Sequence, residues 1–159
     1  MDLKLTRYKQ YSREDLHNLT MPSNKKFVRG AGKWGLHGII SVPENKDDFV
    51  FMVTLNGKKY HDWFVEGIEE TGELSWRSQD SQDLNKPQIR KFIYQGVVRR
   101  NIYLMLRTRD EDKYTYLGKL EYVSHYTEYE NPVLFKWQII DWEIKQELFD
   151  DIGLDLLKP

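Results

Sequence analysis

The chain contains no cysteine, which excludes disulfide bonds, thiol catalysis and zinc sites built on cysteine. It has no apolar run long enough to span a bilayer, and Met1 to Leu5 lack the apolar core of a signal peptide. The P-loop, GxSxG, GxGxxG and HEXXH motifs are also missing. These absences predict a cytoplasmic protein with no membrane partner and leave no obvious catalytic motif.

Charge is close to balanced, with a formal net of −1, which argues against a strongly basic coat for nucleic acid. The distribution is uneven, because residues 141–159 hold six acidic and two basic side chains. The rest of the chain is therefore mildly basic, which is compatible with a localised phosphate-binding face. A solvated surface without a partner is the simpler interpretation of charge alone.

The chain is rich in aromatic side chains, which make up 14% of its 159 residues. Its total hydrophobic content is 40%. This length fits one domain with a substantial core. From Tyr60 to Trp142, short apolar segments alternate aromatic residues with polar and basic ones. Such segments can build a barrel with a pocket on which a planar ligand stacks.

Local signals predict mainly strands. Ser12 and Asp15 form a variant capping box for a short helix whose Leu16 and Leu19 face inward. Asn56-Gly57 predicts a hairpin turn. The expected strands are 34–42, 49–55, 59–65, 74–79, 101–108, 114–122 and 133–144, and the other expected helices are 87–95 and 146–157.

These elements predict an α+β, mainly β fold: a partly closed antiparallel β-barrel with short flanking helices. Residues 1–145 are expected to form this single barrel domain, and residues 146–159 an acidic C-terminal helix or tail. The mouth of such a barrel offers a small-ligand site.

Metal and acid–base chemistry has weak support. Glu66, Glu69 and Glu70 lie near the spacing of metal-dependent nuclease carboxylates, and Asp80 and Asp83 are close in sequence, but no lysine follows at the compact nuclease spacing. The histidines are scattered, and a structural role is the simpler interpretation for each. We expect no catalytic residue, no metal and no cofactor.

Trp76 differs from the other aromatic residues because its sequence neighbours are polar or charged: Ser75, Arg77, Ser78 and Gln79. On a strand Trp76 and Ser78 share one face, and Arg77 and Gln79 the other. An indole beside hydroxyl and amide groups suits a planar base. Core packing and ligand contact both remain open for Trp76, and equally for the residues Tyr60, Asp62, Trp34 and Tyr116.

Eight motifs in order resemble the SRA-like (PUA-related) domain found at the C-terminus of type IV, modification-dependent restriction helicases and beside HNH nucleases. They are Tyr11-Ser12-Arg13-Glu14-Asp15-Leu16, Trp34-Gly35-Leu36-His37-Gly38-Ile39, Tyr60-His61-Asp62, Leu74-Ser75-Trp76-Arg77-Ser78-Gln79, Ile102 to Arg107, Tyr114 to Gly118, Tyr122 to His125 and Pro132 to Ile139. Two departures, Leu74 for an aromatic residue and Leu106 for a valine, remove no polar site group.

The resemblance implies a DNA-binding module that reads a modified base, such as methylcytosine, after flipping it from double-stranded DNA. A nuclease or helicase domain or subunit is then the expected partner, since those portions are missing here. The base-binding candidates are Trp76, Tyr60, Trp34, Tyr116, Asp62, Ser78 and Gln79. The phosphate-binding candidates are Lys25, Lys26, Arg29, Arg77, Arg99, Arg100 and Arg107.

Three alternatives stay open at this stage. The same aromatic pocket suits an RNA-binding or small-ligand PUA-like domain. A small metal-dependent nuclease would use Glu66, Glu69 or Asp80. The acidic tail would suit a protein-interaction domain that docks a nuclease subunit.

Overall fold

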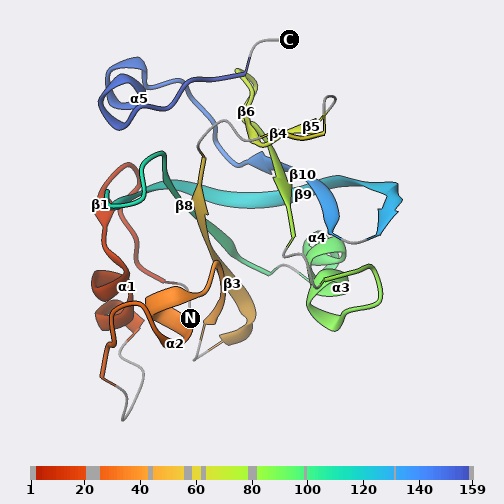
Figure 1. Ribbon diagram of the computed structural model, residues 1–159, viewed down its shortest axis with the longest axis horizontal. Coiled ribbons are helices and arrows are strands. Elements are labelled where there is room, and N and C mark those ends of the chain that lie inside the picture. Colours follow the sequence, from red (N-terminus) through yellow and green to blue (C-terminus); the bar gives the residue numbers. More distant parts are fainter. Residues whose placement is uncertain are drawn as a thin grey trace.

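The computed structural model describes residues 3–20, 26–42, 45–55, 59–61, 64–78, 82–98, 100–130 and 132–157. Figure 1 shows a curled sheet with α1 and α2 on one side, α3 and α4 on another, and α5 beyond one end. The strands are β1 (Gln10–Tyr11), β2 (Ile39–Val42), β3 (Asn45–Thr54), β4 (Lys59–His61), β5 (Phe64–Val65), β6 (Gly67–Ile68), β7 (Glu73–Arg77), β8 (Ile102–Arg107), β9 (Tyr114–Glu130) and β10 (Val133–Ile139). The helices are α1 (Arg13–Thr20), α2 (Gly32–Leu36), α3 (Pro87–Ile93), α4 (Gln95–Val98) and α5 (Gln146–Ile152).

The main sheet joins eight strands in the order β2-β3-β8-β9-β10-β7-β6, with β1 paired to β9. Adjacent strands of this sheet pair antiparallel, with the exception of β3 and β8. Those two strands are parallel, with Phe49 opposite Ile102 and Thr54 opposite Arg107. The prediction of a purely antiparallel sheet was therefore wrong. After β3 the chain passes through β4 to α4 before β8, and such a crossover permits parallel pairing.

Strands β3 and β8 are buried on both faces. Phe49, Phe51 and Val53 enter a first core cluster on one face, whereas Val50 and Met52 enter a second cluster on the other. The same alternation divides β8. Burial on both sides explains why these two strands read as continuous apolar runs.

The sheet curls but does not close. Within the described residues its path ends at β2 and β6, and no strand pairing joins these ends. The curl nevertheless brings β3 and β7 face to face, because the rings of Phe51 and Trp76 stack with centroids 4.6 Å apart and an interplanar angle of 17°. The predicted barrel is thus present only as an open, strongly curved sheet.

The first helix begins as the sequence predicts. The Ser12 amide donates to the Asp15 carboxylate at 2.9 Å, and the Asp15 amide donates to the Ser12 hydroxyl at 3.0 Å. The backbone hydrogen bond from Ser12 lowers the pKa of the Asp15 carboxyl. Leu16 is buried as predicted, but Leu19 is 48% exposed, because the buried face of α1 runs through Leu16 and Thr20 instead.

Three expectations about strands were wrong. Residues 34–42 are not one strand, because Trp34 lies in α2 and β2 begins only at Ile39. Residues 59–65 are not one strand either, because β4 pairs antiparallel with β5. Among the described residues β3 pairs with β2 and β8 and not with β4, as the hairpin expected at Asn56-Gly57 would require. The turn residues themselves lie outside the described residues.

The later helices begin where predicted, but α3 ends at Ile93 and is followed by the unpredicted α4, and α5 ends at Ile152 rather than Leu157. Pro87 opens α3, whose Ile89 and Phe92 are fully buried. Helix α5 ends at Gly153, whose positive φ of 72° suits a residue without a side chain. Phe149 of α5 stacks on Trp142 at 5.5 Å. The acidic C-terminal segment is thereby fixed to the first core cluster.

Candidate functional site

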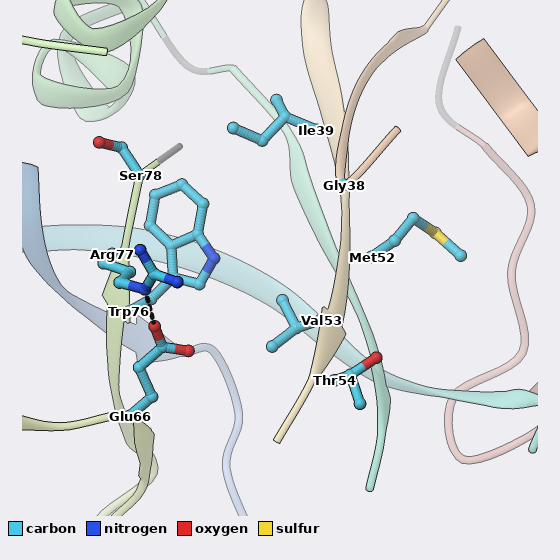
Figure 2. Close-up of a pocket in the computed structure, with 9 residues that line it drawn as sticks. All are labelled: Gly38, Ile39, Met52, Val53, Thr54, Glu66, Trp76, Arg77 and Ser78. Atoms are coloured by element: carbon cyan, nitrogen blue, oxygen red, sulfur yellow. Dashed lines mark ion pairs between the residues drawn. The ribbon is translucent and has the colours of Figure 1, made fainter. Parts of the chain in front are cut away.

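A pocket of about 370 Å³ lies where the two ends of the curled sheet face each other. We call it the β3–β7 pocket. Figure 2 shows β7 on one side and the β2–β3 pair on the other. The lining residues described by the structure are Gly38, Ile39, Met52, Val53, Thr54, Glu66, Trp76, Arg77 and Ser78. Its volume lies within the range of small-ligand sites, about 300–1,000 Å³.

Trp76 forms an aromatic wall of this pocket. Its side chain comes from β7 and points toward the β2–β3 pair in Figure 2. The indole stacks on Phe51 and contacts Phe92 and Trp137 edge to face, at centroid distances of 6.1 and 6.4 Å. Only 7% of Trp76 is exposed. The ring is therefore held rigidly by the core while it borders the cavity.

Arg77 and Glu66 form an ion pair at the pocket. The Arg77 Nε lies 2.9 Å from a Glu66 carboxylate oxygen, and their side chains are 34% and 20% exposed. Figure 2 marks this ion pair with a dashed line beside β7. Because solvent screens such a half-exposed pair, its main effect is to orient the guanidinium rather than to stabilise the fold.

Ser78 continues the β7 wall beyond the end of the strand. Its hydroxyl accepts a hydrogen bond from the Val133 amide at 2.8 Å, and its own amide donates to the Val133 carbonyl at 2.9 Å. The residue is only 2% exposed. Ser78 thus fixes the wall to β10.

The opposite wall includes a peptide edge of β3. Alternate residues of a strand direct their peptide groups to opposite neighbours. Leu55 donates its amide to Arg107 on the β8 side, and Met52 donates to Gly38 on the β2 side. By this alternation the peptide groups of Thr54 face away from β8, where β2 has ended. The edge presents donor and acceptor groups across the pocket from Trp76.

Two other aromatic candidates lie elsewhere. Trp34 is 5% and Tyr116 6% exposed, and both belong to the second core cluster, on the other face of the sheet from Trp76. Tyr116 contacts Tyr103 there at 6.2 Å. The structure therefore does not bring these two side chains to the β3–β7 pocket.

Several candidates cannot be placed. Tyr60 belongs to β4 by its backbone, but its side chain lies outside the described part of the structure. The same holds for every atom of the residues Lys25, Asp62, Gln79 and Arg99. Their roles stay predictions.

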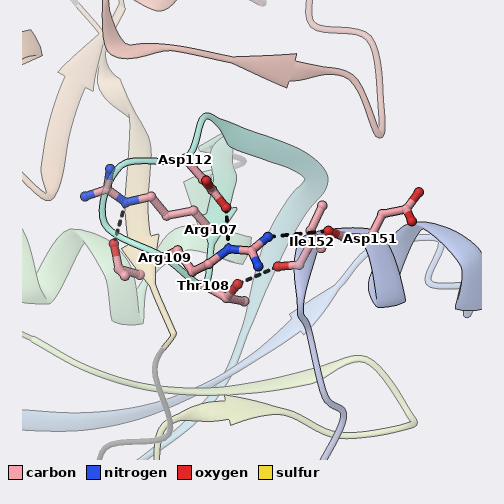
Figure 3. A network of polar contacts seen from close by, with 7 residues as sticks. Arg107, Thr108, Arg109, Asp112, Asp151 and Ile152 are labelled. Carbon is pink, nitrogen blue, oxygen red and sulfur yellow. Dashed lines mark hydrogen bonds and ion pairs between the residues drawn. The ribbon is translucent and has the colours of Figure 1, made fainter.

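The remaining cationic candidates differ in their surroundings. Lys26 and Arg29 are exposed on the segment before α2. Arg100 donates to the Lys91 carbonyl at 3.2 Å, which ties it to α3. Arg107 donates its Nε to the Thr54 hydroxyl at 2.8 Å (Figure 3).

Figure 3 shows Arg107 beside a set of polar contacts that connect the β8–β9 turn to α5. Arg109 pairs with Asp112 at 2.7 Å and donates to the Asp151 carbonyl at 3.5 Å. Thr108 donates its hydroxyl to the Ile152 carbonyl. Arg107 instead lies over the Tyr114 ring at 4.5 Å. Its charge thus lies against the second core cluster, while its hydrogen bond reaches a residue that lines the pocket.

Tyr122 and His125 form a hydrogen-bonded pair on β9, with the phenol oxygen 2.7 Å from Nδ1. Burial raises the pKa of the Tyr122 phenol and lowers the pKa of the His125 imidazole. Both shifts favour the neutral pair. The two rings flank Phe135, which connects them to the Trp76 wall.

This pair predicts a pH dependence of stability. The folded pKa of His125 lies below its unfolded value of about 6.5, so the unfolded state binds protons more readily as the pH falls. The full contribution is present above the unfolded pKa, and part of it is lost below. Urea unfolding at pH 7.5 and 5.5 should show a smaller loss of stability for His125→Gln than for the wild type. Equal losses would contradict this assignment.

The carboxylates considered for a nuclease do not converge where they can be seen. Glu66 pairs with Arg77, the backbone of Glu69 forms an isolated β-bridge with Leu157, and Asp80 lies outside the described residues. Across the described ranges, no group of three or more His, Asp or Glu side chains is placed to hold a metal ion.

Sequence reasoning missed most of the wall opposite Trp76. Gly38, Ile39 and the Met52–Thr54 edge line the pocket, although nothing in their sequence marks them as ligand contacts. Glu66 was considered only as a metal ligand. Its actual position follows from the pairing of β6 with β7, which brings Glu66 beside Arg77. No local sequence signal encodes that pairing.

The fold and the pocket define a mainly β, α+β protein with an aromatic-walled pocket at the open side of its main sheet. Comparison with family models then places the chain. It belongs to the family described as "Domain of unknown function (DUF3427)", whose model matches residues 5–152. No match was found among curated proteins.

Among solved structures, the chain is similar to the crystal structure of Arabidopsis thaliana SUVH6 in complex with SAM. The TM-score is 0.53 and the sequence identity 13%, over 91% of this chain. The chain spans only 27% of the length of that chain. At this identity the similarity concerns the fold alone. No described helix combines the length and apolar character needed to cross a membrane.

Proposed function

We propose that this protein is a DNA-binding module that reads a modified base, such as methylcytosine, flipped from duplex DNA into the β3–β7 pocket. The observation that carries the proposal is the rigid Trp76 indole, which borders a cavity opposite a strand edge. In modification-dependent restriction, a nuclease or helicase domain or subunit would act on the DNA that this module binds. The order of motifs that resemble SRA-like domains supports this role.

Energetics favour a base as the ligand. Extruding a base costs a few kcal/mol, and stacking on an aromatic ring returns about 1–3 kcal/mol. Because Trp76 is fixed by Phe51, little further ordering is needed when a ligand stacks on it. A preformed wall thus offsets much of the extrusion cost.

The remaining lining suits the other parts of a pyrimidine. Ile39 and Val53 provide apolar surface for a methyl group, which discriminates by about 1–3 kcal/mol in a fitted pocket. The peptide edge at Thr54 can pair with donors and acceptors on the rim of the base. Arg77 at the pocket and Lys26 and Arg29 before α2 supply cations for phosphate.

The test is binding to matched duplexes that differ only in one cytosine, methylated or not. Fluorescence anisotropy at fixed salt should show about 10- to 200-fold tighter binding to the modified duplex. A single-stranded RNA of the same sequence, used as competitor, separates this function from RNA recognition. Equal affinity for the two duplexes would overturn the modified-base proposal, and preferential displacement by RNA would favour the PUA-like alternative.

A further inference from the structure

Two arginines from different elements meet at one tyrosine ring. The guanidinium carbon of Arg107, at the end of β8, lies 4.5 Å from the centroid of the Tyr114 ring. The guanidinium carbon of Arg13, at the start of α1, lies 5.6 Å from the same centroid. Tyr114 is only 2% exposed, whereas both arginines are half-buried. We call Arg13, Arg107 and Tyr114 the two-arginine site.

No carboxylate balances the charge of this site. Among the described residues, neither Arg13 nor Arg107 forms an ion pair with an aspartate or glutamate. Placing two like charges side by side, each partly removed from water, is costly unless an anion accompanies them. The ring of Tyr114 offsets part of that cost through cation–π attraction. The charge pattern therefore favours an anionic ligand.

Arg13 is held in place by neutral acceptors. Its Nη1 donates to the carbonyls of Trp34 and His37, at 3.3 and 2.8 Å, which ties α1 to the end of α2. Its Nη2 donates to the Tyr114 hydroxyl at 3.3 Å. These partners orient the guanidinium without neutralising it, so the positive charge of Arg13 remains available to an anion.

Arg107 keeps the donors that an anion needs. Its Nε donates to the Thr54 hydroxyl at 2.8 Å, and within the described residues its two Nη groups donate no hydrogen bond. Figure 3 shows this guanidinium pointing away from the Arg109 side chain and its contacts with α5. A planar guanidinium fixed through Nε, with both Nη groups unused, matches two oxygens of one phosphate.

Thr54 connects the two-arginine site to the β3–β7 pocket. Thr54 is among the residues that line the pocket. In Figure 2 the Val53 side chain points toward Trp76, whereas the Thr54 hydroxyl points to the other side of β3. Alternation along a strand produces this arrangement, and it is on the far side that the hydroxyl accepts the Arg107 bond. The pocket and the two-arginine site thus lie on opposite faces of the same end of β3.

From this placement we infer that the two-arginine site binds a backbone phosphate of the DNA whose flipped base occupies the β3–β7 pocket. The inference rests on the proposed function. Arg107 supplies the paired donors, and Arg13 adds a second positive charge that the sequence alone does not mark for this role. Such a contact positions the DNA and carries no sequence information itself.

The first test measures salt dependence in the variant Arg107→Gln. Losing one phosphate contact should reduce the slope of log affinity against log salt by about 0.9, equally for modified and unmodified duplexes. The matched control is Arg90→Gln, because Arg90 is an exposed arginine of α3. This helix packs against the first core cluster, on the face of the sheet opposite to Tyr114, so the control should keep the wild-type slope. Thermal unfolding establishes that both variants are folded.

The second test needs no substitution. In the [15N]arginine-labelled wild type, the Nε–H signal of Arg107 should shift when an unmodified duplex is added, and that of Arg90 should not. A shift with hexaglutamate but not with the duplex would overturn the inference in favour of an acidic protein partner.

An unchanged slope in folded Arg107→Gln, or an unchanged Arg107 signal at saturating duplex, would also overturn the inference, whatever the base preference. Equal wild-type affinity for the two duplexes, with the slope still reduced in Arg107→Gln, would overturn the base-reading function and leave the two-arginine site as a phosphate site.

Discussion

Replacing Trp76 with leucine is expected to weaken binding to a modified duplex by about 5- to 150-fold. Leucine keeps an apolar side chain on β7 but removes the planar face, so about 1–3 kcal/mol of base stacking is lost. Binding to the unmodified duplex should change much less, because phosphate contacts dominate that affinity. Anisotropy titrations with both duplexes measure the ratio directly.

The control for this substitution is Trp137→Leu. Trp137 belongs to the same aromatic cluster and is fully buried, but it is not among the residues that line the β3–β7 pocket. Both variants lose comparable core packing, so a shared loss of stability cancels in the comparison. If Trp137→Leu reduces discrimination as much as Trp76→Leu does, Trp76 acts through packing and the stacking role is wrong.

The second large effect concerns stability. Phe92→Ala is expected to lower the free energy of unfolding by about 3–5 kcal/mol, because it removes a fully buried ring and leaves a cavity. Phe92 projects from α3 into the aromatic cluster. Its ring contacts are Phe49, Phe51, Trp76, Phe135 and Trp137, at centroid distances of 5.1 to 6.1 Å. Urea denaturation followed by circular dichroism measures the change.

Tyr94→Ala provides the comparison on the same segment. Tyr94 follows α3 and is 53% exposed, so its truncation should change stability by no more than about 0.5 kcal/mol. A loss below about 1 kcal/mol for Phe92→Ala would mean that α3 is not anchored as described.

The sequence predicts those parts of the fold that short-range chemistry determines. The reciprocal bonds of Ser12 and Asp15 involve residues three apart, and Pro87 fixes the first turn of α3 by its own ring. Strand pairing depends on distant partners instead. Thr54 lies opposite Arg107, 53 residues away, and no turn signal encodes that register. This is why the local Asn56-Gly57 signal predicted the wrong neighbour for β3.

The candidate site divides in the same way. Trp76, Arg77 and Ser78 are consecutive, so any placement of β7 keeps them together, and all three line the pocket. Trp34 and Tyr116 were grouped with them as aromatic residues of the motifs that carry the resemblance. The curl of the sheet decides which face each ring occupies, and that curl depends on the whole strand order.

The open side of the sheet has a mechanical consequence. Where the structure describes the chain, β3 and β7 touch through rings such as Phe51 and Trp76 and share no backbone hydrogen bonds. Flattening the sheet slightly would widen the pocket by moving these rings apart, whereas a closed barrel would have to break backbone hydrogen bonds between strands to widen. The stiffness of the sheet, rather than a fixed width, would then determine how large a base modification the β3–β7 pocket accepts.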